Sequence, residues 1–248
     1  MKVKSILVSQ PQPANENSPY LELSKRNKIK IDFRSFIHVE GVEAKDVRQQ
    51  KIDFSKFTAV IFTSRNVIDN YFRLAQEMRF QVPDDMKYFC QSEAIAFYLQ
   101  KYIVYRKRKT YVGEKGIEDL ESYFKKHKDE KYLLPSSDVL NPAVPKFLDK
   151  MGIDWERGML CRTVSSDLSD LEDVKYDILV FFTPSGIKSL FENFPQFKQE
   201  STRIAVFGKT TVKAAKEMGL RIDIEAPTPE TPSMTMALDK YLQKVNKN

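Results

Sequence analysis

The sequence predicts an α/β fold of two similar doubly wound parallel-sheet lobes, joined by a two-stranded β linker with a cleft between them. One observation is a repeat. A strand-like stretch, Phe-Thr, a small polar step and a helical pattern occur in IFTSRNVIDNYF (61–72) and again in FFTPSGIKSLFENF (181–194). The other is that the strands AVIF, DILVFF and RIAVF are continuous apolar runs. Strands of a parallel sheet that helices cover on both faces have this pattern.

The helices follow from apolar spacing. Within 187–194 the apolar residues fall at i, i+3, i+4 and i+7, which is one stripe of a helix. Thr183 can cap the first N–H groups of this helix, and Pro184 suits its first position. Gly219 can adopt the left-handed conformation that ends the helix of KTTVKAAKEMG. These local signals place the polar steps at helix starts.

The repeat extends along the whole chain. MKYFCQSEAIAFYLQ and TRIAVFGKTTVKAAKEMG share the order strand, polar turn, helix. The segment 131–164 resembles the N-terminal strand, loop, helix and second strand, and YVGEKGIEDLESYF matches TPETPSMTMALDKYL. Two copies of one α/β half are therefore present.

The order of the copies predicts how the lobes are divided. The N-terminal strand–helix piece has no partners until the last third of the chain, so we expect 1–36 and 166–248 to form lobe one. Lobe two, 40–162, is inserted into it. The linker is expected from the extended segments 31–42 and 156–166, which pair as two strands.

Composition narrows the class of protein. With 248 residues and 42 % hydrophobic residues the chain can bury a real core, so disorder is not expected. Only eight glycines are present, and neither a dinucleotide-binding glycine motif nor a P-loop occurs. The net charge of +6 suits an anionic partner but is modest for a nucleic-acid binder.

Cofactor and membrane signals are weak. Two cysteines, Cys90 and Cys161, and two histidines, His38 and His127, make a structural zinc site unexpected. No apolar stretch has the length of a membrane span or of a secretory signal core. We expect a cytoplasmic protein without a metal site that binds neither nucleic acid nor membrane.

The candidate site consists of small polar residues at the expected helix starts. Ligands of open parallel sheets gather beyond the carboxyl ends of the strands, where helix N–H groups and the helix dipole favour anions. The alternative is that these residues are ordinary helix caps, and the signal lies in their recurrence. The substrate-binding candidates are Thr63, Ser64, Arg65, Asn66, Gln91, Ser92, Thr183, Pro184, Ser185, Gly186, Gly208, Lys209, Thr210 and Thr211.

Other candidates have simpler structural explanations. The basic run 105–109 could contact nucleic acid, but a solvated surface explains it. His38 lies in the expected linker, and His127, in KKHKDE, is expected to be exposed. Cys161 has no base nearby in sequence, so a buried structural thiol is favoured over a nucleophile. The lone Trp155 is expected to pack at the start of a strand.

Taken together, the sequence resembles the uroporphyrinogen-III synthase family over almost its whole length. The resemblance is carried by FTSRNVI and FTPSGI, by VFGKTTVKAAKEMGL, by MGIDWERGMLCRTV and by the closing EAPTPETPSMTMAL. It implies a two-lobed monomeric lyase of haem and other tetrapyrrole biosynthesis without a cofactor. Such enzymes take a linear tetrapyrrole with eight carboxylates, hydroxymethylbilane, close the ring and invert the last pyrrole to give uroporphyrinogen III.

The resemblance also implies roles for single residues. Thr211 stands where the family has a functional Thr, whereas Glu93 stands where a Thr is expected. Cys161 occupies the position of a Tyr proposed to help the hydroxyl leave, and Ser9-Gln10-Pro11 replaces Thr-Arg-Pro. These departures keep a second hypothesis open, a non-catalytic binding or regulatory protein with the same fold.

Overall fold

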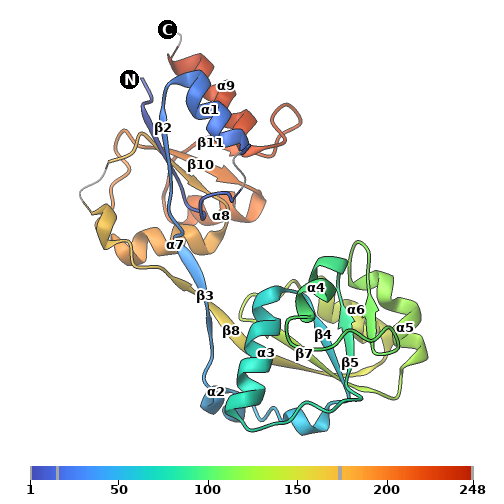
Figure 1. Cartoon of the computed structure of the whole chain (residues 1–248). Helices are drawn as coiled ribbons and strands as arrows, with labels where there is room; N and C mark the ends of the chain where they lie inside the picture. Colours follow the sequence, from blue (N-terminus) through green and yellow to red (C-terminus); the bar gives the residue numbers. More distant parts are fainter. Residues whose placement is uncertain (1, 15–16, 173–174, 247–248) are drawn as a thin grey trace. The chain divides into compact units, whose positions relative to one another are not determined.

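A computed structural model describes residues 2–14, 17–172 and 175–246 (Figure 1). The chain divides into two compact units. Unit 1 is Met1–His38 with Val164–Asn248, and unit 2 is Val39–Thr163. Each unit has its own sheet and its own buried clusters, so each is described by itself.

Within the described residues, unit 1 holds a five-stranded sheet in the order β11-β10-β9-β1-β2. Every neighbouring pair in it is parallel. Its strands are β1 (Ser5–Val8), β2 (Lys30–Phe33), β9 (Ile178–Phe181), β10 (Arg203–Phe207) and β11 (Ile222–Ala226). Its helices are α1 (Pro19–Asn27), α7 (Pro184–Asn193), α8 (Lys209–Glu217) and α9 (Met234–Asn246), with a short 3-10 turn at Ser169–Leu171.

The sheet of unit 2, over the residues described, has the order β3-β8-β7-β4-β5-β6. Its pairs from β8 to β6 are parallel. The strands are β3 (Ile37–Gly41), β4 (Ala59–Phe62), β5 (Lys87–Cys90), β6 (Thr110–Val112), β7 (Lys131–Ser137) and β8 (Asp154–Ser165). The helices are α2 (Ala44–Gln49), α3 (Arg65–Glu77), α4 (Glu93–Leu99), α5 (Glu121–Lys126) and α6 (Ala143–Met151), with 3-10 turns at Phe54–Lys56 and Ile117–Leu120.

The two sheets have the same spatial order once the sequence repeat is applied. The repeat pairs β7 with β1, β8 with β2, and β4, β5 and β6 with β9, β10 and β11. Unit 2 then reads β8-β7-β4-β5-β6, and unit 1 reads β2-β1-β9-β10-β11. In unit 1 the chain forms β1 and β2 before β9, β10 and β11. In unit 2 it forms β4, β5 and β6 before β7 and β8. The predicted fold class, two similar doubly wound parallel sheets, is confirmed.

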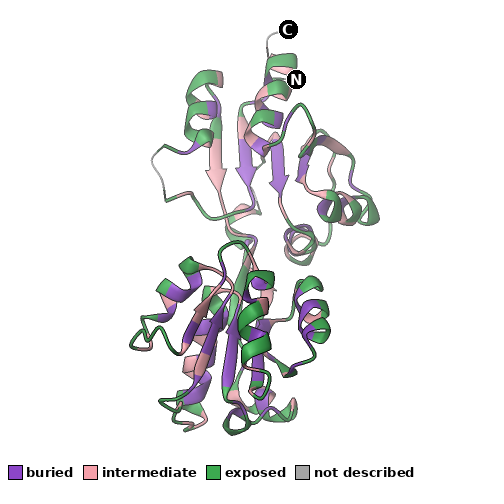
Figure 2. Ribbon diagram, turned by 90° about the vertical axis from the view of Figure 1, so that its right-hand side faces the viewer, coloured by how far each residue is buried: buried purple, intermediate pink, exposed green. Residues whose placement is uncertain are grey.

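Helices cover both faces of each sheet because the strands are apolar on both faces. In β1, Ile6 and Val8 pack with α1 and α9, whereas Leu7 points to the opposite face and packs with α7 and α8. In β4, Val60 lies on the side of α3 and α4, and Ile61 on the side of α5 and α6. Figure 2 shows the central strands of each sheet largely buried and the outer faces of the helices exposed.

The outward connection is two strands rather than the single extended segment 31–42. β2 ends at Phe33 and belongs to the sheet of unit 1, and β3 begins at Ile37. Between them Phe36 is buried, with its ring 5.6 Å from that of Phe181. Anchoring this aromatic ring in the core interrupts the strand, so only β3 lies beside β8 in the linker.

Strands β3 and β8 run antiparallel. The N–H of Val42 donates to the carbonyl of Leu160, and the N–H of Ser166 donates to the carbonyl of Phe36. β8 is also a parallel neighbour of β7, so its segment 156–166 is not purely a linker. An antiparallel edge strand on an otherwise parallel sheet is a common arrangement.

Candidate functional site

In unit 1 the predicted residues of two helix starts lie at one edge of the sheet. β10, β9 and β1 are adjacent and parallel, so their carboxyl ends meet there. The chain order reverses between β1 and β9, because β2 lies on one side and β10 and β11 on the other. In doubly wound sheets this switch point is where ligands bind. Ser9 directly follows β1, and Thr183 follows β9 after Phe182.

The start of α7 is built as predicted. The Thr183 hydroxyl accepts a hydrogen bond from the N–H of Gly186 at 3.1 Å, and Pro184 occupies the first helical position. Thr183 and Pro184 are exposed, Ser185 is half-buried and Gly186 is buried. A β-carbon on Gly186 would lie 3.7 Å from the hydroxyl of Ser9, which places that side chain beside the helix start. Ser9 therefore lies at this helix start, although it was not among the substrate-binding candidates predicted from the sequence.

The start of α8 has a different geometry. Gly208 precedes the helix with φ 86°, a conformation that favours glycine, and its N–H donates to the carbonyl of Ala226. Lys209 and Thr210 are exposed, but Thr211 is fully buried. Among the described residues, the Thr211 hydroxyl is one of the few buried side-chain groups without a hydrogen-bond partner. Thr211 thus differs from its expected place on an accessible binding surface.

In unit 2 the residue that caps α3 is Ser64, one position after the Thr63 that the repeat aligns with Thr183. The Ser64 hydroxyl accepts from the N–H of Val67 at 3.4 Å. Thr63 is half-buried at the strand end, and Arg65 and Asn66 are exposed on the first turn. The apolar face of α3 determines which residue caps the helix, because Val67 and Ile68 must both reach the core.

The start of α4 lies beside that of α3, since β4 and β5 are adjacent and parallel. The N–H of Gln91 donates to the carbonyl of Phe62, and Ser92 precedes the helix without a side-chain capping bond. Glu93 is the first helical residue, a position where a carboxylate is favourable to the helix dipole. In helix position it corresponds to Lys209 of α8, whereas Thr211 is the third helical residue.

A concavity in unit 2 joins these two helix starts. It has a volume of about 640 Å³ and is lined by Arg65 and Glu93 together with Phe97, Gln100, Tyr105 and Val112, among others. Its aromatic lining residues were not among the candidates predicted from the sequence. The available signal was Phe97, which lies off the buried stripe formed by Ile95, Ala96 and Leu99.

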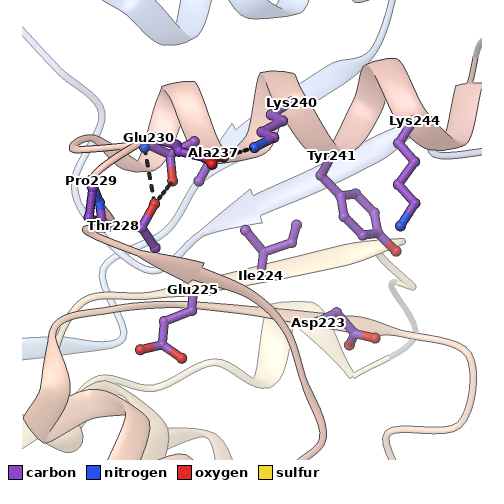
Figure 3. A pocket seen from close by; sticks show the side chains of 11 residues that line it. Asp223, Ile224, Glu225, Thr228, Pro229, Glu230, Ala237, Lys240, Tyr241 and Lys244 are labelled. Carbon is purple, nitrogen blue, oxygen red and sulfur yellow. Dashed lines mark hydrogen bonds and ion pairs between the residues drawn. The ribbon is translucent and has the colours of Figure 1, made fainter.

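Unit 1 has a groove of about 530 Å³ between β11 and α9 (Figure 3). None of the predicted site residues lines it. Its walls carry both charge signs, with Glu225 on the strand and Lys240 on the helix, where Lys240 pairs with Glu230. This groove lies at the outer edge of the sheet and not at the switch point.

Cys161 lies in the core of unit 2. A bulge in β8 between the partners of Ser136 and Ser137 allows two successive residues, Leu160 and Cys161, to be buried. The thiol has the carbonyl of Ser136 as a distant acceptor, at 3.9 Å. Burial, followed by the charge of Asp138, raises the pKa of Cys161, so at neutral pH it is a protonated packing group and no nucleophile.

The remaining candidates divide similarly. His127 is half-buried and not exposed as expected, because its ring lies 4.8 Å from that of Tyr111, and burial lowers its pKa. His38 contacts the hydroxyl of Ser166 at 3.0 Å in unit 1. The run 105–108 is exposed, consistent with a solvated surface. Trp155 donates to the carboxylate of Asp149 at the start of β8.

The described part of the chain contains no group of three or more His, Cys, Asp or Glu side chains arranged to hold a metal ion. In the same residues, no helix combines the length and the apolar character needed to cross a bilayer.

The fold and its polar edges define a class: a two-unit protein of duplicated, doubly wound parallel sheets. The family model for uroporphyrinogen-III synthase HemD matches residues 19–236. The chain therefore belongs to the uroporphyrinogen-III synthase family.

The chain is similar to solved structures of uroporphyrinogen-III synthases. The crystal structure of uroporphyrinogen-III synthetase from Helicobacter pylori 26695 is similar with a TM-score of 0.58 and 18 % identity, covering 97 % of this chain and 99 % of that one. A mutant uroporphyrinogen III synthase from the extremely thermophilic bacterium Thermus thermophilus has a TM-score of 0.49 and 13 % identity, covering 99 % and 100 %. A search of curated proteins found no match.

Proposed function

We propose that this chain is a uroporphyrinogen-III synthase that takes hydroxymethylbilane, expels water, closes the ring and inverts the last pyrrole. The observation that carries the proposal is the family match over 19–236. The geometry supports it: each unit presents small polar residues and helix N–H groups at the carboxyl edge of a parallel sheet. Such groups suit a ligand with many carboxylates.

The chemistry asked of the protein is mainly positioning. Spontaneous ring closure gives the isomer in which the last ring is not inverted, so the catalyst must hold a curled chain in which the inverting closure is favoured. The groups available at the helix starts are hydroxyls, amides and backbone N–H donors, with positive charge from Arg65 and Lys209. They bind and orient carboxylates and need no strong general acid or base.

Thr211 is the exception in this set. A buried hydroxyl without a partner costs stability, and the usual partner of such a group is a ligand atom or an ordered water. Its N–H donates to the carbonyl of Gly208, so only the hydroxyl remains uncommitted. We propose that this hydroxyl interacts with the substrate when the substrate binds at the first turn of α8.

The test is an isomer assay. Enzymatically made hydroxymethylbilane is supplied to the protein, and the type I and type III products are separated. A large excess of type III over a protein-free control is expected. A product ratio equal to that of the control would show that the chain is not this enzyme.

Single substitutions test how the work is shared. Thr63→Ala and Thr183→Ala each remove one of several positioning groups, so we expect each to reduce the rate of type III formation without abolishing it. The measurement is the initial rate, with circular dichroism to confirm folding. Complete loss of activity in a fully folded Thr63→Ala protein would contradict distributed binding.

A second function is favoured by one observation. Where the family resemblance implies a Tyr that helps the hydroxyl leave, this chain has Cys161, a buried and protonated thiol. A binding protein that kept the fold and lost the reaction would tolerate this replacement. Such a protein would bind the linear tetrapyrrole and leave its product ratio at the control value.

A further inference from the structure

The concavity of unit 2 combines three kinds of lining group that one small ring could satisfy. Phe97 and Tyr105 supply aromatic surface, Arg65 a cation and Glu93 an anion. Phe97 is 76 % exposed and lies off the buried stripe of its helix. A flat ring covering it would remove apolar surface from water.

A contact with Tyr98 positions the Arg65 side chain. Its guanidinium carbon lies 5.4 Å from the centre of the Tyr98 ring, a cation–π contact. The Tyr98 hydroxyl donates to both carboxylate oxygens of Asp69, at 3.0 and 2.9 Å, and the Tyr102 hydroxyl donates to the same carboxylate at 2.5 Å. Tyr98, which supports Arg65, is therefore fixed, and among the described residues no hydrogen-bond acceptor takes the guanidinium donors.

Glu93 is exposed at the first position of α4. Among the ion pairs of the described residues, none joins Glu93 to Arg65, so the two opposite charges of the concavity do not neutralise each other. A carboxylate in this position accepts hydrogen bonds from N–H donors. It would repel a ligand that offered only carboxylates.

We propose that this concavity binds one pyrrole ring that carries a carboxylate side chain. The ring lies against Phe97 and Tyr105, its carboxylate pairs with Arg65, and its N–H donates to Glu93. The proposal rests on the proposed function, because every ring of a linear tetrapyrrole with eight carboxylates offers an N–H and acid side chains. Glu93 then accepts a hydrogen bond from the ring N–H, and its negative charge strengthens that bond.

The direct test follows backbone amide signals of the full chain by ¹⁵N NMR during titration with 3-(1H-pyrrol-3-yl)propanoate. Two analogues remove one feature each: the furan analogue lacks the N–H, and the methyl ester lacks the carboxylate. We expect amide shifts at Glu93 and Phe97, and binding of each analogue weaker by about three- to tenfold, as for a charge-assisted hydrogen bond at an exposed site.

Matched variants assign the two contacts. Glu93→Gln should reduce the preference for pyrrole over furan, because its amide oxygen accepts without a charge, and keep the preference for acid over ester. Arg65→Gln should do the reverse, and Asp69→Asn, which loosens Tyr98, should weaken only the preference for the acid. Lys107→Gln removes one positive charge, as Arg65→Gln does, but from an exposed residue that does not line the concavity. It should alter neither preference. All of these residues are wholly or partly exposed, so folding should be kept.

Three outcomes would overturn the proposal: equal binding of pyrrole and furan by the wild type, shifts confined to other residues, or a response to adenosine monophosphate with none to the pyrrole acid. The isomer assay separates this failure from failure of the proposed function. Type III product without amide shifts at the concavity would refute the ring site alone. Selective pyrrole binding with control-ratio product would refute the enzyme and keep the ring site.

Discussion

Three threonines near helix starts have three different roles. Thr183 is exposed and caps α7, Thr63 is half-buried beside the Ser64 that caps α3, and Thr211 is buried with its hydroxyl unpaired. Residue type and position along the repeat predicted a small polar side chain at each point. Which hydroxyl caps, which packs and which is left free depends on how the following helix turns its apolar stripe to the sheet.

Thr211→Val tests the unpaired hydroxyl at nearly constant shape. Removing a buried group without a partner should leave the free energy of unfolding unchanged or raise it by about 1 kcal/mol. If the hydroxyl serves the reaction, the rate of type III formation should fall at the same time. Urea unfolding and the isomer assay measure the two quantities, and a clear loss of stability would show that the hydroxyl has a structural partner.

The buried thiols predict a loss of stability at high pH. Burial raises the pKa of Cys90 to about 12 from its ordinary value of 9.0. The folded state keeps this proton at a pH where the unfolded chain loses it. The contribution is therefore fully present below pH 9 and declines between pH 9 and about 12, by up to about 1.4 kcal/mol per pH unit for one group.

Cys90→Ala isolates this contribution. Unfolding in urea at pH 8 and at pH 10.5 should show a smaller pH-dependent loss in the variant than in the wild type, although the variant is less stable at both. The comparison subtracts the buried tyrosines, which titrate in the same direction. Equal pH-dependent losses in the two proteins would mean that the Cys90 thiol ionises normally in the folded state.

At the scale of the element, each helix start combines a predictable signal with one that packing decides. Ser or Thr before an apolar stripe predicted α3 and α7, and Gly219, with φ 72°, follows α8 as expected. The bulge in β8 and the break between β2 and β3 were not predictable, because each follows from burying a particular side chain, Cys161 or Phe36, against a distant segment.

Two glycines at helix starts should respond oppositely to the same change. Gly208 has φ 86°, so Gly208→Ala should cost about 1–3 kcal/mol of backbone strain, although nothing lies within 4 Å of the added carbon. Gly186 lies inside α7 with only ordinary contacts, so Gly186→Ala should be neutral or stabilising by up to about 1 kcal/mol. Urea unfolding midpoints measure both, and destabilisation of similar size in the two variants would refute the backbone explanation.

At the scale of the whole molecule, the two units have separate cores. Leu134 belongs to a cluster of unit 2 and Leu238 to a cluster of unit 1, and both are fully buried. Each sheet packs only with helices of its own unit in these clusters. The duplication visible in the sequence has therefore produced two bodies, each with a complete hydrophobic core.

This predicts that each unit can be destabilised alone. Leu134→Ala should cost about 2–5 kcal/mol in unit 2, and Leu238→Ala a similar amount in unit 1. Hydrogen exchange of the full chain in low urea should show protection lost in the mutated unit and retained in the other. Equal loss of protection in both units from either substitution would mean that the chain unfolds as one cooperative body.

The sequence by itself determined the duplicated strand–helix units, the parallel sheets and the polar helix starts. Those features come from local patterns: runs of apolar residues, helical spacing and caps, whose physics operates within about a dozen residues. Only the tertiary structure decided that Thr211 is buried and that Arg65 and Glu93 share a concavity with Phe97 and Tyr105. Burial and neighbourhood depend on how segments distant in the chain pack together, and no local pattern records that.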